Sequence, residues 1–137
     1  MITLYVESSA VLAWLLGERS SAELVRRINE ADAIVTSVLT LLESERALIR
    51  AEGQHLLTAA ESQKLRGMLA RAAASWVLME ISADVVRGAA RTFPKEPVPT
   101  LDALHLATAL LFLQAFPDLQ VLTLDERIVA NCGALGI

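Results

Sequence analysis

Four acidic side chains stand at or near points where an apolar stretch gives way to a helical pattern. Glu7 ends the run LYVE, and Asp125 ends the run VLTLD. Asp102 opens the helical pattern PTLDALHLATA, and Glu43 lies within TSVLTLLESERAL. Carboxylates that crowd together repel one another unless a cation neutralises them. If these four meet in space, they therefore predict a metal site.

The donor type indicates which cation such a site would hold. Oxygen ligands without a set of His or Cys side chains are typical of a hard cation, Mg²⁺ or Mn²⁺. Magnesium in turn suggests phosphate chemistry. The formal net charge of −4 argues against a protein that coats nucleic acid non-specifically. It does not exclude a protein that cuts nucleic acid at a metal site.

The elements expected around these acids alternate between strands and helices. Apolar runs predict strands at 2–6, 33–35, 76–81 and 120–123. Helical spacing predicts helices at 10–16, ended by Gly17, and at 20–31, 37–50, 58–74, 84–92, 101–116 and 126–132. This alternation implies an α/β fold with a parallel sheet covered on both faces. Ligands of such sheets bind beyond the carboxyl ends of the strands, where the acids would meet.

Length and composition bound the protein further. The chain of 137 residues is expected to form a single domain, 1–137, and its hydrophobic share is 54%. The longest uncharged stretch, Ala103 to Pro117, is too short and polar to span a bilayer, and no leader is visible, so we expect no membrane association. The apolar excess then suggests a surface patch covered by another subunit or partner. With one cysteine, Cys132, no internal disulfide is possible, and a cytoplasmic location is natural.

Two of the acids also have simpler interpretations. Asp102 could sit in the first turn of its helix after a Thr100 cap and favour the helix dipole. Thr123 and Glu126 have the spacing of a capping box, which would make Asp125 incidental.

The other two acids differ in how readily a simpler role fits. Glu43 could be a solvated helix residue, and periodicity alone does not choose between Glu43 and Glu45. Glu7 is harder to dismiss, because a charge at the end of a buried strand needs a partner.

Four segments together resemble a known family. LYVESSAVLAW, TSVLTLLESERAL, LDALHLATAL and VLTLDERIVANCGALGI resemble the PIN domain, and within it the VapC-type toxins of bacterial toxin–antitoxin (VapBC) pairs. The resemblance runs nearly end to end and in the right order. It implies a PIN-like fold, with a short central parallel sheet flanked by helices on both faces. It also implies a Mg²⁺-dependent endoribonuclease, the toxin component of a type II system.

The resemblance also assigns roles to the acids. The family's acids correspond to Glu7, Glu43, Asp102 and Asp125, and the TLLE context selects Glu43 over Glu45. Glu7, Asp102 and Asp125 would then hold Mg²⁺, for which Mn²⁺ can substitute, while Glu43 would be a further ligand or orient the attacking water. The sequence departs from the family at its first acid, which is an aspartate there and Glu7 here.

Supporting residues follow from the same resemblance. The hydroxyls of Ser8, Ser9 and Thr123 would hydrogen-bond a site carboxylate or a metal-bound water, with a helix cap as the alternative. Arg46 and Arg50, one and two turns beyond the third acid of the set, could hold RNA phosphates, although surface solvation is the simpler role for at least one.

Other conspicuous residues receive structural interpretations. We expect His105 to be a satisfied, half-buried histidine rather than a base, and Trp14 and Trp76 to be core or interface residues. We expect Cys132 to be a small buried hydrophobe.

The resemblance implies a cognate antitoxin, an RNA substrate and a homodimer, with Trp14 among the candidate contacts. Two rival interpretations remain open. One is a PIN-fold binding module that Glu7 has weakened as a catalyst. The other is a phosphoacceptor receiver domain, which would need a lysine near the late strands, whereas Lys64 and Lys95 lie in a helix and a proline loop.

Overall fold

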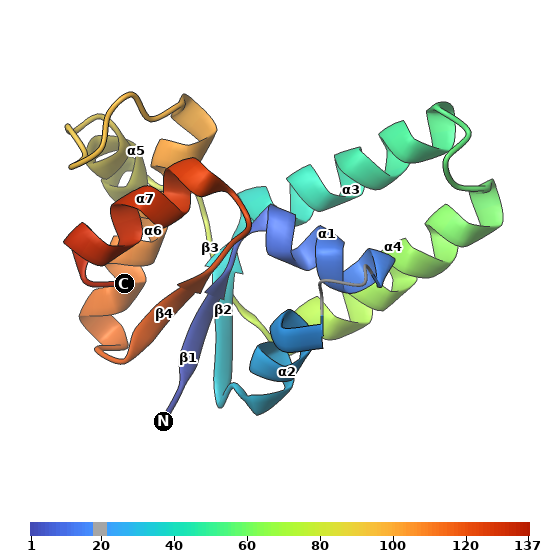
Figure 1. The fold of residues 1–137 in the computed structure, drawn as a ribbon, viewed down its shortest axis with the longest axis horizontal. Coiled ribbons are helices and arrows are strands. Elements are labelled where there is room, and N and C mark those ends of the chain that lie inside the picture. Colours follow the sequence, from blue (N-terminus) through green and yellow to red (C-terminus); the bar gives the residue numbers. More distant parts are fainter. Residues whose placement is uncertain (18–21) are drawn as a thin grey trace.

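The computed structural model describes residues 1–17 and 22–137, which form a four-stranded sheet with helices on both faces (Figure 1). The strand order is β3-β2-β1-β4, and every neighbouring pair is parallel. The strands are β1 (Thr3–Val6), β2 (Ala33–Ser37), β3 (Val77–Met79) and β4 (Leu119–Leu122). The α/β class and the PIN-like arrangement expected from the sequence are confirmed.

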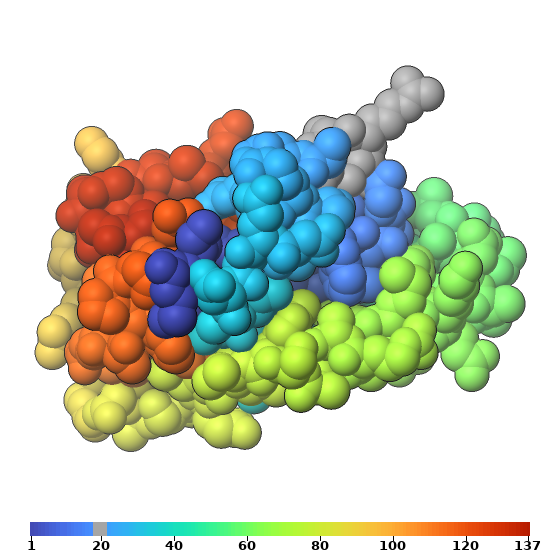
Figure 2. Space-filling model, turned by 90° about the horizontal axis from the view of Figure 1, so that it is seen from below, coloured from blue at the N-terminus to red at the C-terminus, as the bar shows by residue number. Residues whose placement is uncertain are grey.

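The helices divide into two groups around the sheet (Figure 1). One group consists of α1 (Ser8–Leu16), α2 (Ala22–Glu30), α3 (Val38–Gly53) and α4 (Ala59–Ala73). The other consists of α5 (Ala83–Ala89), α6 (Thr100–Ala115) and α7 (Glu126–Leu135). Helices α3 and α4 form a hairpin that projects away from the sheet. Figure 2 shows the opposite end of the strands, where β1 and β2 begin between α2 and the last turns of α6.

Alternation along β1 divides the core between the two faces of the sheet, since successive side chains of a strand point to opposite sides. Leu4 and Val6 are buried in a cluster with apolar residues of α1, α3 and α4, such as Val11, Leu48 and Leu69. Tyr5, between them in sequence, is buried on the other face with residues of β2 and α6 that include Val35, Ala109 and Phe112. Tyr5 therefore carries a phenol oxygen beneath α6.

The boundaries of several elements differ from those expected. Helix α1 begins two residues early, at Ser8, because Glu7 caps it. The residue before α6 is Pro99, so Thr100 is the first helical residue and not its cap. Strand β3 is shorter than expected, and α7 continues to Leu135, where Gly136 ends it with φ of 78°.

Two helix ends near position 20 bear on the same expectations. Gly17 ends α1 in the left-handed region, with φ of 62°, as predicted. The expected helix over 20–31 begins at residues outside the described ranges, and α2 covers its remainder from Ala22. Within residues 1–17 and 22–137, no helix is long and apolar enough to cross a membrane.

Candidate active site

The carboxyl ends of β1 and β4 lie side by side at the point where the strand order reverses. From β1 the chain proceeds through β2 to β3 on one side, while β4 pairs with the other side of β1. The backbone N–H of Glu7 donates to the Leu122 carbonyl at 3.1 Å, which extends the pairing of these two strands by one bond. Such a reversal is the usual ligand-binding position in open parallel sheets.

Glu7 lies at this junction and is only 3% exposed. Its Oε2 accepts hydrogen bonds from the Ser9 backbone N–H at 2.7 Å and the Ser8 hydroxyl at 3.1 Å. Its Oε1 accepts one from the Thr123 hydroxyl at 3.1 Å. The carboxylate thus caps α1, where the positive end of the helix dipole also favours a negative charge. These donors offset the cost of burying it.

A network of hydroxyls extends from Glu7 toward Asp125. The Thr123 hydroxyl oxygen accepts from the Asp125 backbone N–H at 3.0 Å and lies 3.3 Å from the Ser9 hydroxyl. The Ser9 hydroxyl in turn accepts from the Leu124 N–H at 2.8 Å. The predicted supporting hydroxyls are therefore brought together, and they fix the β4–α7 connection against the start of α1.

Asp125 is itself the cap of α7. Its Oδ1 accepts from the backbone N–H groups of Arg127 at 2.9 Å and Ile128 at 3.4 Å. The expected capping box between Thr123 and Glu126 is not the arrangement found, because Thr123 bonds to Glu7 and to Asp125 instead.

Asp102 occupies the first turn of α6 and faces the other two acids. Burial raises the pKa of its carboxyl, and the negative charges of Asp125 and Glu7 raise it further, while His105 and Arg127 act in the opposite direction. The three carboxylates thus lie within one another's electrostatic field. We refer to Glu7, Asp102 and Asp125 as the acid cluster.

Glu43 is held apart from the acid cluster by a histidine. Its Oε1 lies 2.5 Å from Nε2 of His105, and Nδ1 of His105 lies 2.8 Å from the Tyr5 phenol oxygen. His105 is 2% exposed, so the expectation of a satisfied histidine was right and that of a half-buried one was wrong. Its place one turn after Asp102, in DALHLA, was the available signal for this contact.

The residues of the acid cluster fit a hard cation by donor type and charge. All their donors are oxygens, and the raised pKa of Asp102 shows that these carboxylates lack a neutralising charge. Yet in the part of the chain that the structure describes, no three Asp, Glu, His or Cys side chains are close enough to form a ready metal site. Closing a ligand set would require side chains to move, since both oxygens of Glu7 cap α1.

The predicted phosphate contacts and the apolar candidates are placed as follows. Arg46 and Arg50 are exposed on α3. Trp14 and Trp76 are half-buried and pack on one another, with ring centroids 6.5 Å apart. Cys132 is half-buried against the cluster that joins α6 and α7.

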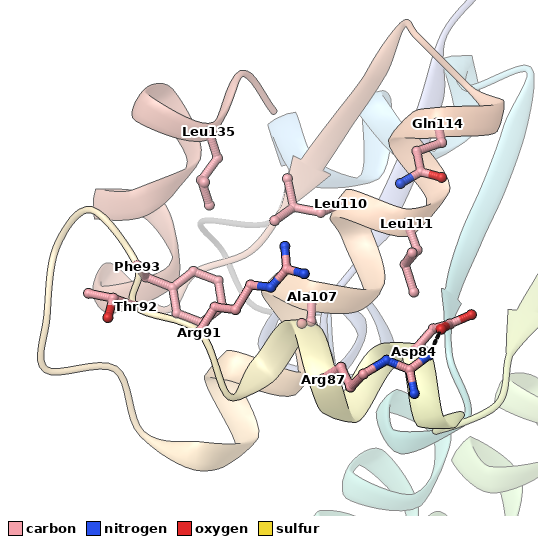
Figure 3. Close-up of a pocket in the computed structure, with 11 residues that line it drawn as sticks. Asp84, Arg87, Arg91, Thr92, Phe93, Ala107, Leu110, Leu111, Gln114 and Leu135 are labelled. Atoms are coloured by element: carbon pink, nitrogen blue, oxygen red, sulfur yellow. Dashed lines mark hydrogen bonds and ion pairs between the residues drawn. The ribbon is translucent and has the colours of Figure 1, made fainter.

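A cavity of about 310 Å³ lies elsewhere, between α5 and α6 (Figure 3). Ala107 and Leu110 of α6 contribute to its apolar wall, and Arg91 lies beside them. Arg87 also lines it and forms an ion pair with Asp84. None of the four predicted acids lines this cavity, so it is separate from the acid cluster.

The family follows from a comparison of the sequence with known domains. The sequence profile of the PIN domain matches residues 4–134, and the chain therefore belongs to the PIN domain family. The resemblance seen in the sequence is confirmed at that level. No curated protein matches the chain significantly.

Two solved structures share the fold. One is Mycobacterium tuberculosis VapC20, described as a sarcin–ricin loop cleaving toxin, with 16% identity, a TM-score of 0.66 and coverage of 93% of each chain. The other is a toxin–antitoxin complex from Klebsiella pneumoniae, with 16% identity and a TM-score of 0.63. The match covers 93% of this chain and 90% of the Klebsiella chain.

Proposed function

We propose that this chain is a Mg²⁺-dependent endoribonuclease that acts as the toxin of a type II toxin–antitoxin system in the cytoplasm, folded as a single domain. The observation that carries the proposal is the convergence of Glu7, Asp102 and Asp125 where the strand order reverses, with the pKa of Asp102 raised by the other two charges. Membership of the PIN domain family supports it. So does the shared fold with a protein described as an RNA-cleaving toxin.

Each site residue has a role in hydrolysis of a phosphodiester bond. Glu7, Asp102 and Asp125 would hold Mg²⁺, which when bound supplies a lowered pKa for the attacking water and positive charge beside the phosphate. Glu43 accepts a hydrogen bond from that water and aims it at phosphorus. Ser8 and the other supporting hydroxyls keep the Glu7 carboxylate fixed. In-line attack by water needs no covalent intermediate with the protein.

Arg46 and Arg50 are proposed to bind RNA phosphates on either side of the cut. Both are exposed and lie on α3, one and about two turns beyond Glu43. Guanidinium groups suit this task because their planar donors match phosphate oxygens in pairs.

The proposed partners are a cognate antitoxin and a second copy of the chain. Large apolar side chains remain exposed at Leu16, Leu42 and Leu56, which lie on or next to α1 and α3. Trp14 is half-buried in the same region. An antitoxin is supported by the toxin–antitoxin complex that shares this fold.

A second candidate function is a PIN-fold binding module without catalysis. The observation that favours it is that Glu7 uses both carboxylate oxygens to cap α1, which leaves the acid cluster without a ready ligand set in the described residues. Aspartate in this position would be shorter by one methylene and would reach the helix start differently.

One experiment separates the two functions. Purified protein is incubated with labelled RNA in millimolar Mg²⁺, in Mn²⁺, and in excess chelator, beside Asp102→Asn. Cleavage that requires the metal and Asp102 supports the nuclease. RNA or antitoxin binding without any cleavage in either metal supports the binding module.

A further inference from the structure

We propose that His105 is a positioning residue for Glu43, held in one orientation by the buried phenol of Tyr5. The inference rests on the proposed ribonuclease function and assigns a task to a side chain outside the acid cluster.

The geometry joins three elements through one imidazole ring. His105 on α6 contacts Glu43 on α3 through Nε2 at 2.5 Å and Tyr5 on β1 through Nδ1 at 2.8 Å. The rings of Tyr5 and His105 stand edge to face, with centroids 6.0 Å apart and an interplanar angle of 74°. Both ring nitrogens therefore have a partner, as a buried histidine requires.

The phenol settles which ring nitrogen carries the hydrogen. Burial raises the pKa of Tyr5 well above its usual value and outweighs the opposite effect of Thr36 and Thr40, so the phenol keeps its proton. It donates that proton to Nδ1, which must then be the acceptor nitrogen of a neutral ring. The hydrogen of the ring consequently lies on Nε2 and is donated to Glu43.

The arrangement has a consequence for the proposed role of Glu43. Its side chain is 24% exposed, so without His105 it could adopt several rotamers. The bond to Oε1 fixes one of them and leaves Oε2 to accept from the attacking water. Since Tyr5 lies two residues before Glu7 in the same strand, the chain Tyr5–His105–Glu43 also fixes Glu43 relative to the acid cluster.

Apolar packing alone does not account for a histidine at this place. His105 is 2% exposed, and burying an imidazole is costly unless its nitrogens are bonded. A residue of similar size without nitrogens would fill the space more cheaply, but it would leave the Tyr5 hydroxyl and Oε1 of Glu43 without this partner.

The test uses a matched pair of amide substitutions. The amide nitrogen of His105→Gln can reach the position of Nε2 and still donate to Glu43, whereas that of His105→Asn stops near the position of Nδ1. We expect His105→Gln to retain most of kcat, and His105→Asn to lose about 10- to 100-fold in kcat with little change in KM. His55→Asn, at the exposed second histidine, is the control and should behave as the wild type.

Two further measurements keep the test independent of folding and of activity. Rates are compared at equal folded fraction from circular dichroism. Nitrogen-15 spectra of the metal-free protein should show the hydrogen of His105 on Nε2, and Tyr5→Phe, which removes one oxygen from the core, should change the Nδ1 resonance and lower kcat several-fold.

The outcomes are distinct. Equal losses in His105→Gln and His105→Asn at equal folded fraction would overturn the positioning role, as would a hydrogen on Nδ1. If the wild type cuts no RNA under any metal condition, the proposed function fails, and the spectra alone then decide whether His105 orients Glu43.

Discussion

The Thr123 hydroxyl, just beyond β4, donates a hydrogen bond to Oε1 of Glu7 at the end of β1, 3.1 Å away and 116 residues distant in sequence. The bond spans the point where the strand order reverses. It holds a carboxylate that is only 3% exposed and that also caps α1. The start of one helix and the acid cluster are therefore stabilised by the same side chain.

Removing this bond should destabilise the fold. Thr123→Val keeps the shape but leaves a buried charged carboxylate with one donor fewer, and hydrogen bonds to charged groups contribute about 1.5–3 kcal/mol. We expect a loss of that size in the free energy of unfolding, measured by urea denaturation. Thr123→Ser, which retains the hydroxyl, is the control and should lose much less. Equal losses in both variants would mean that the methyl packing matters and the bond does not.

Asp102 should cost the metal-free protein stability at neutral pH. Folding raises the pKa of this carboxyl through burial and through the charges of Asp125 and Glu7, so the folded state binds its proton more readily than the unfolded state. Stability is then lost as pH rises from the unfolded value, about 3.9, through the folded pKa. Asp102→Asn should melt higher than the wild type at pH 7 in chelator, and the gap should shrink toward pH 4. Glu80→Gln, at an exposed site, should show no such gap.

Metal should reverse that order. Mg²⁺ or Mn²⁺ bound among Glu7, Asp102 and Asp125 stabilises the folded state by about 2.7 kcal/mol when its concentration is 100 times Kd. We expect millimolar Mn²⁺ to raise the melting temperature of the wild type and to leave that of Asp102→Asn nearly unchanged. If neither protein responds to either metal, the acid cluster is not a metal site.

The sequence was sufficient for the class of fold and for the convergence of three acids. Apolar runs alternating with helical spacing require a parallel sheet, and acids that follow β1 and β4 must meet if those strands are neighbours. The caps were less accessible. Thr123 and Glu126 match a capping box by spacing, but the backbone of the β4–α7 connection directs Thr123 to Glu7 and leaves Asp125 as the cap.

The contact between His105 and Glu43 could not be predicted from either segment alone. The helical pattern places His105 on the same side of α6 as Asp102, yet the partner of its Nε2 comes from α3, 62 residues earlier. Only the packing of α6 over β1 and β2 determines which carboxylate it meets. Local spacing therefore identified the residues, and tertiary packing decided how Glu43 is separated from the other acids.

Arg46 and Arg50 should contribute to RNA binding through charge. Neutralising a phosphate contact with single-stranded nucleic acid lowers the salt dependence of binding by about 0.7 in the log–log slope for each contact. We expect the double variant Arg46→Ala/Arg50→Ala to bind RNA more weakly and with a smaller slope, measured by fluorescence anisotropy with Asp102→Asn as background. Arg71→Ala is the control, because Arg71 ends α4 shortly before β3 begins, at the sheet end opposite the acid cluster. An unchanged slope in the double variant would assign both arginines to the solvated surface.

The last prediction concerns Glu7, whose two roles make opposite demands on its substitution. As a cap, it needs only an acceptor oxygen near the Ser9 N–H, which the amide oxygen of glutamine supplies. As a metal ligand, it needs its negative charge, which glutamine lacks.

Glu7→Gln should therefore fold with a melting temperature close to that of the wild type but lose metal-dependent cleavage and the metal-induced shift in melting temperature. Glu7→Asp keeps the charge and is a good cap residue, so it should preserve or raise ribonuclease activity. Ser8→Ala, which removes one 3.1 Å bond to the same carboxylate and keeps its charge, is the matched control and should remain active. If Glu7→Gln cuts RNA as fast as the wild type with equal metal affinity, Glu7 is a helix cap alone, and the metal would have to be held by Asp102 and Asp125 without it.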